Sequence, residues 1–361
     1  MSSSTVPALS ELSEHPLMQA PMAGGVSRPE LAAAVCESGG LGFLAAGYKT
    51  PEAMYEEVKQ LRALTRRPFG VNVFLPQPAA GDPSALDVYR HQLADEAAWF
   101  ETPLGDTGLG SEDGYEGKLA VLLDDPVPVV SFTFGCPSPK VLERFAQRGT
   151  CTVVSATTVA EAWTAEQSGA AAVCLQGVEA GGHRATFRDV PSADDEGGGL
   201  GLLTLVTQAR AALSVPLVAA GGLMRGSEIA AVLTAGADAV QLGTAYLACP
   251  ESGAPEIHKR ALTDPVFPGT ALTRAFSGRL ARGLVNRFVR EHGPYAPAAY
   301  PEVHHLTAPL RRAAAAAGDA QGLHLWAGQG HRLARPLPAK ELTRVLLEES
   351  AAAGGPEGGD G

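Results

Sequence analysis

Eight short apolar runs are spread along the chain, and each of them stops at a glycine, a proline or a polar residue. They begin at Leu17, Leu41, Phe69, Val127, Cys151, Ala171, Val215 and Ala239. Continuous apolar runs of this length are typical of parallel β-strands that are covered on both faces. Most of the segments between them have helical patterns, and several of these segments open with Ser or Thr followed by Pro or Glu. This alternation predicts an α/β fold, a (β/α)8 TIM barrel with its active site at the carboxyl ends of the strands.

An open doubly wound sheet is the alternative for the same alternation of strands and helices. That fold commonly carries a G-x-G-x-x-G motif directly after its first strand. The stretch "APMAGG" at residues 20–25 does not match that motif. The sequence therefore favours the barrel, which we expect to occupy residues 1–263.

Two segments are longer than a bare barrel requires. Residues 77–125 follow the third strand and are predicted to form a partly helical insertion beside the barrel mouth. Residues 264–348 follow the eighth strand and are predicted to form a helical segment that covers the active site. The tail 349–361 contains a low-complexity run of Ala and Gly, and it is predicted to be disordered.

The charge and the cysteines exclude several classes of protein. The formal net charge is −11 and there is no long Lys/Arg run, which argues against a nucleic-acid partner. The five cysteines are scattered, as expected of a reduced cytoplasmic protein without a disulfide framework. No apolar stretch is long enough to cross a membrane, and the N-terminus does not resemble a signal peptide. We expect a cytoplasmic protein without a metal site, either a monomer or a homodimer.

The ends of the seventh and eighth strands are rich in glycine. Gly221 and Gly222 end one strand, with a helix start a few residues on, and Gly243 and Thr244 end the next strand. In barrels this corner commonly holds a phosphate through backbone N–H groups and a hydroxyl. Glycines that merely form tight turns are the alternative, but two such ends in consecutive repeats favour phosphate. Because there is no Walker-type motif, the phosphate is predicted to belong to a cofactor.

Other strand ends supply what an isoalloxazine ring requires. Pro21, Met22 and Ala23 bring backbone to the barrel mouth, while the side-chain amides of Asn72 and Gln176 can both donate and accept hydrogen bonds. Together with the phosphate corner they favour flavin mononucleotide, FMN. After Gln176 the chain runs through further glycines to a histidine, "QGVEAGGHR". A single histidine is more often structural, but this position favours a base or an anion anchor beside the ring.

The chain closely resembles the nitronate monooxygenases, formerly called 2-nitropropane dioxygenases, and in particular their bacterial class I branch. The matching motifs cover nearly the whole chain and include "QAPMAGG" at residue 19, "GVNVFLP" at 70, "LQGVEAGGHR" at 175 and "DAVQLGTAYL" at 238. The resemblance implies a (β/α)8 barrel that binds FMN without a covalent bond. It also implies oxidation of alkyl nitronates, such as propionate 3-nitronate, by O2 to a carbonyl compound and nitrite.

The resemblance also assigns site residues. His183 takes the place of the active-site histidine, and Tyr295 and Tyr300 are expected to line the substrate pocket. Together with the strand-end residues above, the cofactor-binding set is Pro21, Met22, Ala23, Asn72, Gln176, Gly181, Gly182, Gly221, Gly222, Gln241, Gly243 and Thr244. His304 and His305 have no ligand spacing for a metal and are interpreted as structural.

Two other functions remain open on the sequence alone. An NAD(P)H-dependent FMN reductase of the enoyl-acyl-carrier-protein reductase type shares the barrel and several of the motifs. The other hypothesis is a non-catalytic regulatory protein that binds FMN. A histidine beside the ring argues against it. Reduction of the flavin by NADH would distinguish the reductase from the monooxygenase.

Overall fold

The computed structural model describes residues 6–78, 82–108, 113–189 and 199–354. Its main sheet has eight parallel strands in the order β1-β9-β8-β6-β5-β4-β3-β2. These strands are β1 (Leu17–Gln19), β2 (Phe43–Ala45), β3 (Gly70–Phe74), β4 (Val129–Thr133), β5 (Cys151–Ala156), β6 (Ala172–Gln176), β8 (Leu217–Ala220) and β9 (Ala239–Leu242). A parallel bridge between Met18 and Leu41 brings β1 next to β2 and closes the ring. The predicted (β/α)8 TIM barrel is thus confirmed.

The side chain of Gln19 strengthens this closure, where a single backbone bridge joins β1 to β2. Its Oε1 accepts a hydrogen bond from the Phe43 N–H at 3.0 Å, and its Nε2 donates to Ser27 Oγ at 2.9 Å. Gln19 is completely buried, so an unpaired amide there would be costly. The same residue therefore joins β1 to β2 and holds the glycine-rich turn that follows β1.

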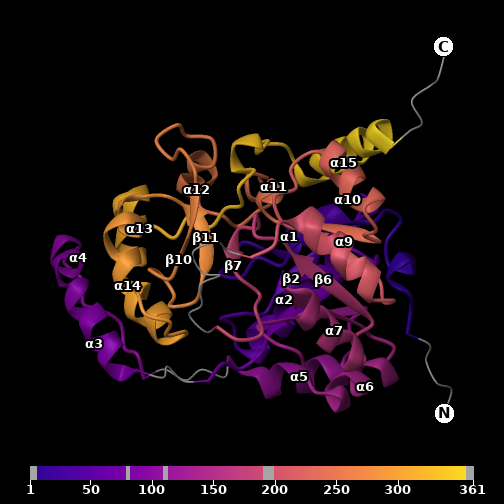
Figure 1. Cartoon of the computed structure of the whole chain (residues 1–361), viewed down its shortest axis with the longest axis horizontal. Helices are drawn as coiled ribbons and strands as arrows, with labels where there is room; N and C mark the ends of the chain where they lie inside the picture. Colours follow the sequence, from indigo (N-terminus) through magenta and orange to yellow (C-terminus); the bar gives the residue numbers. More distant parts are fainter. Residues whose placement is uncertain (1–5, 79–81, 109–112, 190–198, 355–361) are drawn as a thin grey trace.

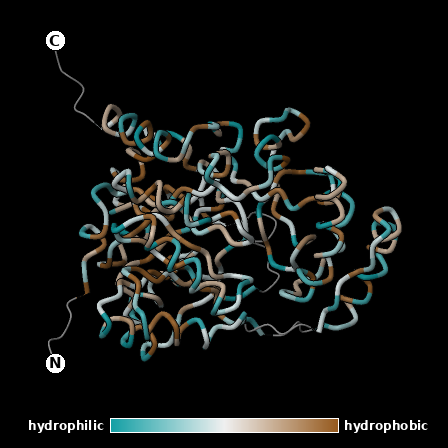
Figure 2. The backbone as a smooth tube through the Cα atoms, turned by 180° about the vertical axis from the view of Figure 1, so that it is seen from behind, coloured by the Kyte–Doolittle hydropathy of each residue, from teal (hydrophilic) through white to brown (hydrophobic). Residues whose placement is uncertain are grey.

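Helices cover the outside of the barrel (Figure 1). They are α1 (Pro29–Cys36), α2 (Pro51–Leu64), α5 (Tyr115–Asp124), α6 (Pro139–Gln147), α7 (Val159–Gln167), α9 (Leu202–Ala212), α10 (Gly226–Thr234) and α15 (Ala339–Gly354). Several begin as their sequences predict, because Thr50 and Thr158 accept N-cap hydrogen bonds and Pro29, Pro51 and Pro139 occupy first-turn positions. Hydrophilic and hydrophobic residues alternate along these helices (Figure 2), as expected when one helical face packs on a core.

Helix α15 packs against α10 and α1 and completes this outer layer. Its buried residues Leu342 and Leu346 belong to the same core as the barrel strands. The helix continues to Gly354, so it includes the first part of the range 349–361 that the sequence predicts to be disordered. Residues 355–361 of that range lie outside the described residues.

The segment between β9 and α15, which we call the cover, lies over the carboxyl ends of the strands. It contains α11 (Thr244–Leu247), α12 (Glu256–Ala261), β10 (Thr270–Thr273), β11 (Ala281–Leu284), α13 (Arg287–His292), η2 (Gly293–Tyr295), α14 (Glu302–Ala317), η3 (Ala320–Gly322) and η4 (His331–Leu333). Strands β10 and β11 form an antiparallel sheet with the two-residue strand β7 (Gly182–His183), in which Ala281 pairs with His183. The glycine-rich stretch after β6 is therefore a sheet edge held by the cover.

The range 77–125 contains helices with two different positions. Helices α3 (Pro83–Gln92) and α4 (Ala94–Trp99) lie beside α13 and α14 at the edge of the molecule (Figure 1), where Tyr89 and Leu93 share a core with Phe288 and Val303. Helix α5 instead packs on α2 and β3 in the outer layer of the barrel. One short helix, η1 (Leu9–Glu11), precedes β1. Within the described residues, no helix combines the length and the apolar character that crossing a membrane requires.

Candidate active site

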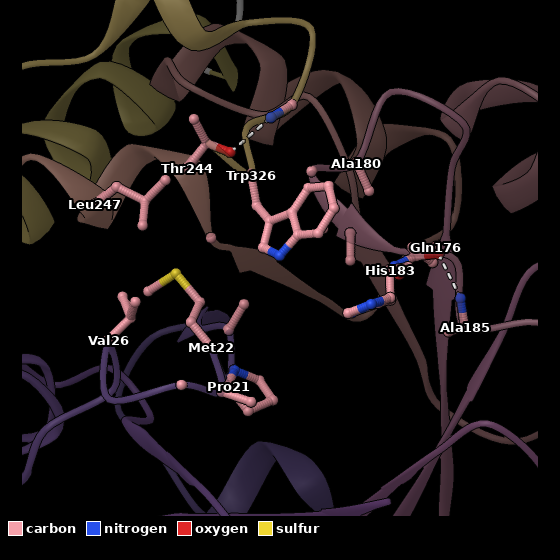
Figure 3. A pocket seen from close by; sticks show the side chains of 18 of the residues that line it. Pro21, Met22, Val26, Gln176, Ala180, His183, Ala185, Thr244, Leu247 and Trp326 are labelled. Atoms are coloured by element: carbon pink, nitrogen blue, oxygen red, sulfur yellow. Dashed lines mark hydrogen bonds between the residues drawn. The ribbon is translucent and has the colours of Figure 1, made fainter. Parts of the chain in front are cut away.

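A cavity of about 370 Å³ lies at the carboxyl ends of the barrel strands, within the size range of cofactor and ligand sites. All twelve residues predicted to bind the cofactor line it, and so does His183. Tyr300 lies just behind the lining, with its ring 5.8 Å from the His183 ring. Tyr295 is 58% exposed and is not among the lining residues, because η2 turns it toward solvent. Figure 3 shows Pro21 and Met22 on one side of the cavity and the Trp326 indole on the other.

The wall formed by the ends of β8 and β9 fits a phosphate group. Gly222 has a φ of 73°, and a Cβ at this position would lie 2.9 Å from the Glu179 Cβ. The N–H groups of Gly222, Gly243 and Thr244 have no protein acceptor among the described residues. Thr244 Oγ1 accepts a hydrogen bond from the Gly328 N–H at 2.9 Å (Figure 3), so its own proton remains free to donate. Unpaired N–H groups and a hydroxyl beside a cavity are suitable donors to phosphate oxygens.

The start of helix α10, which is predicted to lie next to this phosphate site, has other partners. The N–H groups of Met224 and Arg225 donate to the Glu228 carboxylate at 2.6 and 3.0 Å. The Gly226 N–H donates to Glu349 of α15 at 2.9 Å. These carboxylates already cap the helix, so the free donors of this corner come from the strand-end turns.

The two predicted amides differ in how far they are free to bind a ligand. Asn72 Nδ2 donates to Ser131 Oγ and Thr133 Oγ1, both at 2.9 Å, and its carbonyl oxygen receives no hydrogen bond from a described residue. Gln176 instead donates from Nε2 to the His183 carbonyl at 3.0 Å and accepts from the Ala185 N–H at 3.0 Å (Figure 3). Its side chain therefore mainly holds the segment that carries His183.

Ser277 determines which nitrogen of His183 carries the proton. His183 Nε2 lies 2.8 Å from Ser277 Oγ, and that Oγ lies 3.2 Å from the Arg279 carbonyl oxygen. If Ser277 donates its single proton to this carbonyl, Nε2–H donates to Ser277 and both hydrogen bonds form, whereas the reverse arrangement loses one of them. We therefore assign the proton to Nε2. Nδ1, which has no hydrogen-bond partner among the described residues, then has a free lone pair.

Two guanidinium groups make the surroundings of His183 positive. Arg279 is completely buried, with its guanidinium 3.9 Å from the centre of the Phe134 ring and its Nη1 donating to Gln77 Oε1 at 2.7 Å. Arg311 lines the cavity and donates to the His304 carbonyl at 2.8 Å. Burial, followed by the charges of Arg279 and Arg311, lowers the pKa of His183 to about 3. The imidazole is thus neutral at physiological pH, in a cavity that favours anions.

Several lining residues were not identified from the sequence. Tyr48 and Phe134 have positive φ values of 66° and 74°, a strain of about 1–2 kcal/mol each that is typical of functional sites. Arg311 and His304 both line the cavity from one face of α14, although the sequence predicts a structural role for His304. Trp326 comes from the cover and lies 5.4 Å from the His183 ring, centre to centre. Only the spacing of residues 304 and 311, two helical turns apart, could have indicated a shared face.

Elsewhere in the structure, one group of acidic and histidine side chains lies close enough together to bind a metal ion. Among the described residues, Glu96, Glu291 and His292 lie close together outside the cavity. Arg287 forms ion pairs with both Glu96 and Glu291, so a cation already occupies this position. The group joins α4 to α13 and indicates a structural contact.

Replacing Gly222 by alanine is expected to weaken flavin binding at least tenfold. The added Cβ would meet the Glu179 side chain and the backbone would be strained, which moves the strand-end N–H groups. Gly169→Ala is the matched control, because Gly169 also has a positive φ, 95°, but a Cβ there meets nothing within 4 Å. Fluorescence titration of the apoprotein with FMN measures both. Equal affinities for the two variants would contradict a phosphate site at Gly222.

Comparison with known proteins gives a consistent result. The family model "Nitronate monooxygenase" matches residues 6–349. A probable nitronate monooxygenase of Bacillus subtilis is 38% identical over 92% of this chain and 95% of its own length. The structure of a nitroalkane oxidase from Streptomyces ansochromogenes is 66% identical, with a TM-score of 0.93 over 96% of this chain and 99% of that one. FabK from Thermotoga maritima is 27% identical, with a TM-score of 0.72 over 96% of this chain and 97% of its own.

The barrel, its cavity and these similarities define a flavin-dependent oxidoreductase. The family model and the curated relative both extend over most of the chain. The chain therefore belongs to the nitronate monooxygenase family, and its activity is the oxidation of nitronates or nitroalkanes.

Proposed function

We propose that this enzyme uses FMN to oxidise small alkyl nitronates with O2, producing a carbonyl compound and nitrite, and that it belongs to the bacterial class I branch. Propionate 3-nitronate is the substrate we propose to test first. The observation that carries the proposal is a neutral His183 and two guanidinium groups around a cavity with a glycine-rich, phosphate-compatible wall. Gly222, Gly243 and Thr244 would hold the phosphate, and Asn72 with the turn after β1 would contact the ring. When bound, the flavin supplies the electron acceptor.

The positive surroundings support an anionic substrate. The described hydrogen-bond partners of Arg279 and Arg311 are neutral carbonyl, amide, hydroxyl and imidazole groups. Asp189, the carboxylate whose charge acts most on Arg279, is itself paired with Arg274. A nitronate would therefore be stabilised by the charges of Arg279 and Arg311 in a largely buried site. Since a nitronate is already ionised, the protein has to orient it and exclude water, with no proton to remove.

His183 extends the proposed activity to neutral nitroalkanes. With the proton on Nε2, the lone pair of Nδ1 is available to remove the proton from the carbon that bears the nitro group. Gln176 and the pairing of β7 with β11 hold the backbone of His183 from two sides. The similarity to the Streptomyces nitroalkane oxidase supports this second substrate class.

Anaerobic mixing of the purified holoenzyme with propionate 3-nitronate, and separately with NADH, tests the proposal. We expect the flavin absorbance to change rapidly with the nitronate and to stay constant with NADH. Nitrite should then form in proportion to the nitronate consumed when O2 is admitted. Bleaching by NADH alone would assign the enzyme to the reductases, the alternative left open by the sequence.

A further inference from the structure

Tyr48 has an unusual backbone conformation and lies at the cavity, and the proposed function gives it no role so far. It lies in the turn after β2, two residues beyond Ala46, it has a φ of 66°, and it lines the cavity. Its exposed fraction is 36% although it lies among several other residues of the site. A tyrosine held in the left-handed region requires contacts that stabilise this conformation.

A buried ion pair supplies one such contact. The Tyr48 N–H donates to Asp113 Oδ1 at 2.9 Å, and the other carboxylate oxygen, Oδ2, lies 2.7 Å from Lys118 Nζ. The Lys118 side chain is completely buried at the start of α5, in the outer layer of the barrel. The position of the Tyr48 backbone is thereby fixed relative to the barrel itself.

The ring of Tyr48 is held by the cover on one side and by β3 of the barrel on the other. It is stacked on the His304 ring, with centroids 4.3 Å apart and planes 2° from parallel, and it meets Phe74 edge-on at 5.7 Å. The Tyr300 hydroxyl donates to the Tyr48 hydroxyl at 3.3 Å. The proton of Tyr48 is then free to bind an acceptor in the cavity. Burial raises the pKa of Tyr48, so this hydroxyl is protonated at neutral pH.

We propose that Tyr48 orients the substrate by donating its hydroxyl proton to an oxygen of the nitronate or nitro group, and that Asp113 and Lys118 are its positioning residues. The Tyr300 ring lies between the two functional groups: it is 5.8 Å from the His183 ring, and its hydroxyl reaches Tyr48. We therefore place the substrate with its carbon toward His183 and its oxygens toward Tyr48 and Arg311, which all line the cavity. This assignment rests on the proposed function.

Tyr48→Phe tests the proposal because it keeps the stacked ring and removes only the hydroxyl. We expect the KM for propionate 3-nitronate to rise about tenfold while kcat changes less than threefold, the loss of one hydrogen bond to an anion. The affinity for nitrate, a planar anion that is not oxidised, should fall about tenfold when titrated into the holoenzyme by calorimetry. Tyr55→Phe is the matched control, because the Tyr55 hydroxyl donates to Asp125, which like Tyr55 is outside the cavity lining.

The positioning role is tested by removing the ion pair as a unit. The double variant Asp113→Ala with Lys118→Met leaves no unpaired charge, and we expect it to raise the same KM by a similar factor. Adding Tyr48→Phe to it should then have little further effect, since both changes remove the same contact.

Unchanged KM and unchanged nitrate affinity in Tyr48→Phe, with normal flavin content, would overturn the proposal. If the double variant fails to fold, this single variant still decides. A wild-type enzyme without nitronate turnover would instead refute the proposed function, and the nitrate titration would continue to test Tyr48 separately.

Discussion

Replacing His183 by asparagine is expected to lower the oxidation of neutral nitroalkanes by a factor of about 10²–10⁴, the usual contribution of a general base. Turnover of preformed nitronates should keep at least a tenth of its rate, because that reaction requires no proton removal. The measurement is the anaerobic rate of flavin absorbance change with nitroethane and with its nitronate. Equal losses on both substrates would exclude His183 as the base and leave it as an anion anchor.

The same assignment determines the pH dependence. Since the pKa of His183 is lowered to about 3, the base form persists well below the ordinary histidine pKa of about 6.5. We expect the nitroethane rate to change less than twofold between about pH 5.5 and 7.5, where an unperturbed histidine would lose about tenfold. Ser277→Ala, which removes the acceptor of Nε2–H, should lower the nitroethane rate and spare the nitronate rate. A fall in rate centred near pH 6.5 would contradict the neutral imidazole.

Mild acid is expected to destabilise the folded protein strongly. Burial lowers the pKa values of four histidines that line the cavity: to about 3 for His183, 4 for His258 and 2 for His304, and well below the ordinary value for His324. Between the unfolded value of about 6.5 and these folded values, the unfolded chain binds more protons, so stability falls as the pH falls. At pH 5 the loss is on the order of 2 kcal/mol for each histidine, a large fraction of the stability of a typical domain.

Urea unfolding at pH 7 and pH 5, with saturating FMN, measures this loss. His258→Gln is the useful companion variant, because the neutral amide can still donate to the Trp326 carbonyl that His258 Nε2 contacts at 3.0 Å. It should reduce the loss by about a quarter, the share of one of the four histidines. Equal free energies of unfolding at the two pH values would show that these histidines are protonated in the folded protein.

From the sequence it was possible to predict those cavity residues that the barrel topology alone brings together. Asn72, Gly222 and Thr244 come from distant parts of the chain, but the carboxyl ends of parallel barrel strands necessarily surround one opening. Tyr48 lies in the turn after β2, and an aromatic residue after a glycine in such a turn carries no specific signal. What Gln176 binds could not be predicted, because its partners are set by the pairing of β7 with β11.

The contribution of the cover was harder to predict. Its elements are short and irregular, so neither the position of Trp326 over the cavity nor the turn of η2 that exposes Tyr295 follows from a period in the sequence. For the same reason the range 77–125 was treated as one insertion, although α5 takes a regular place in the barrel. Helical spacing identified α14 as a helix without showing which side faces the site.

The position of α15 has a consequence for how the site exchanges its contents. Because this helix completes the outer layer between α10 and α1, the cover is enclosed within the last βα unit of the barrel, with both of its ends attached to the same rigid body. A segment anchored twice cannot swing away on a single hinge, as a domain appended to the end of a chain can. Substrate entry and product release are therefore expected to depend on side-chain motion at the cavity mouth. Shortening the chain before Ala339 would remove part of the barrel as well as its end.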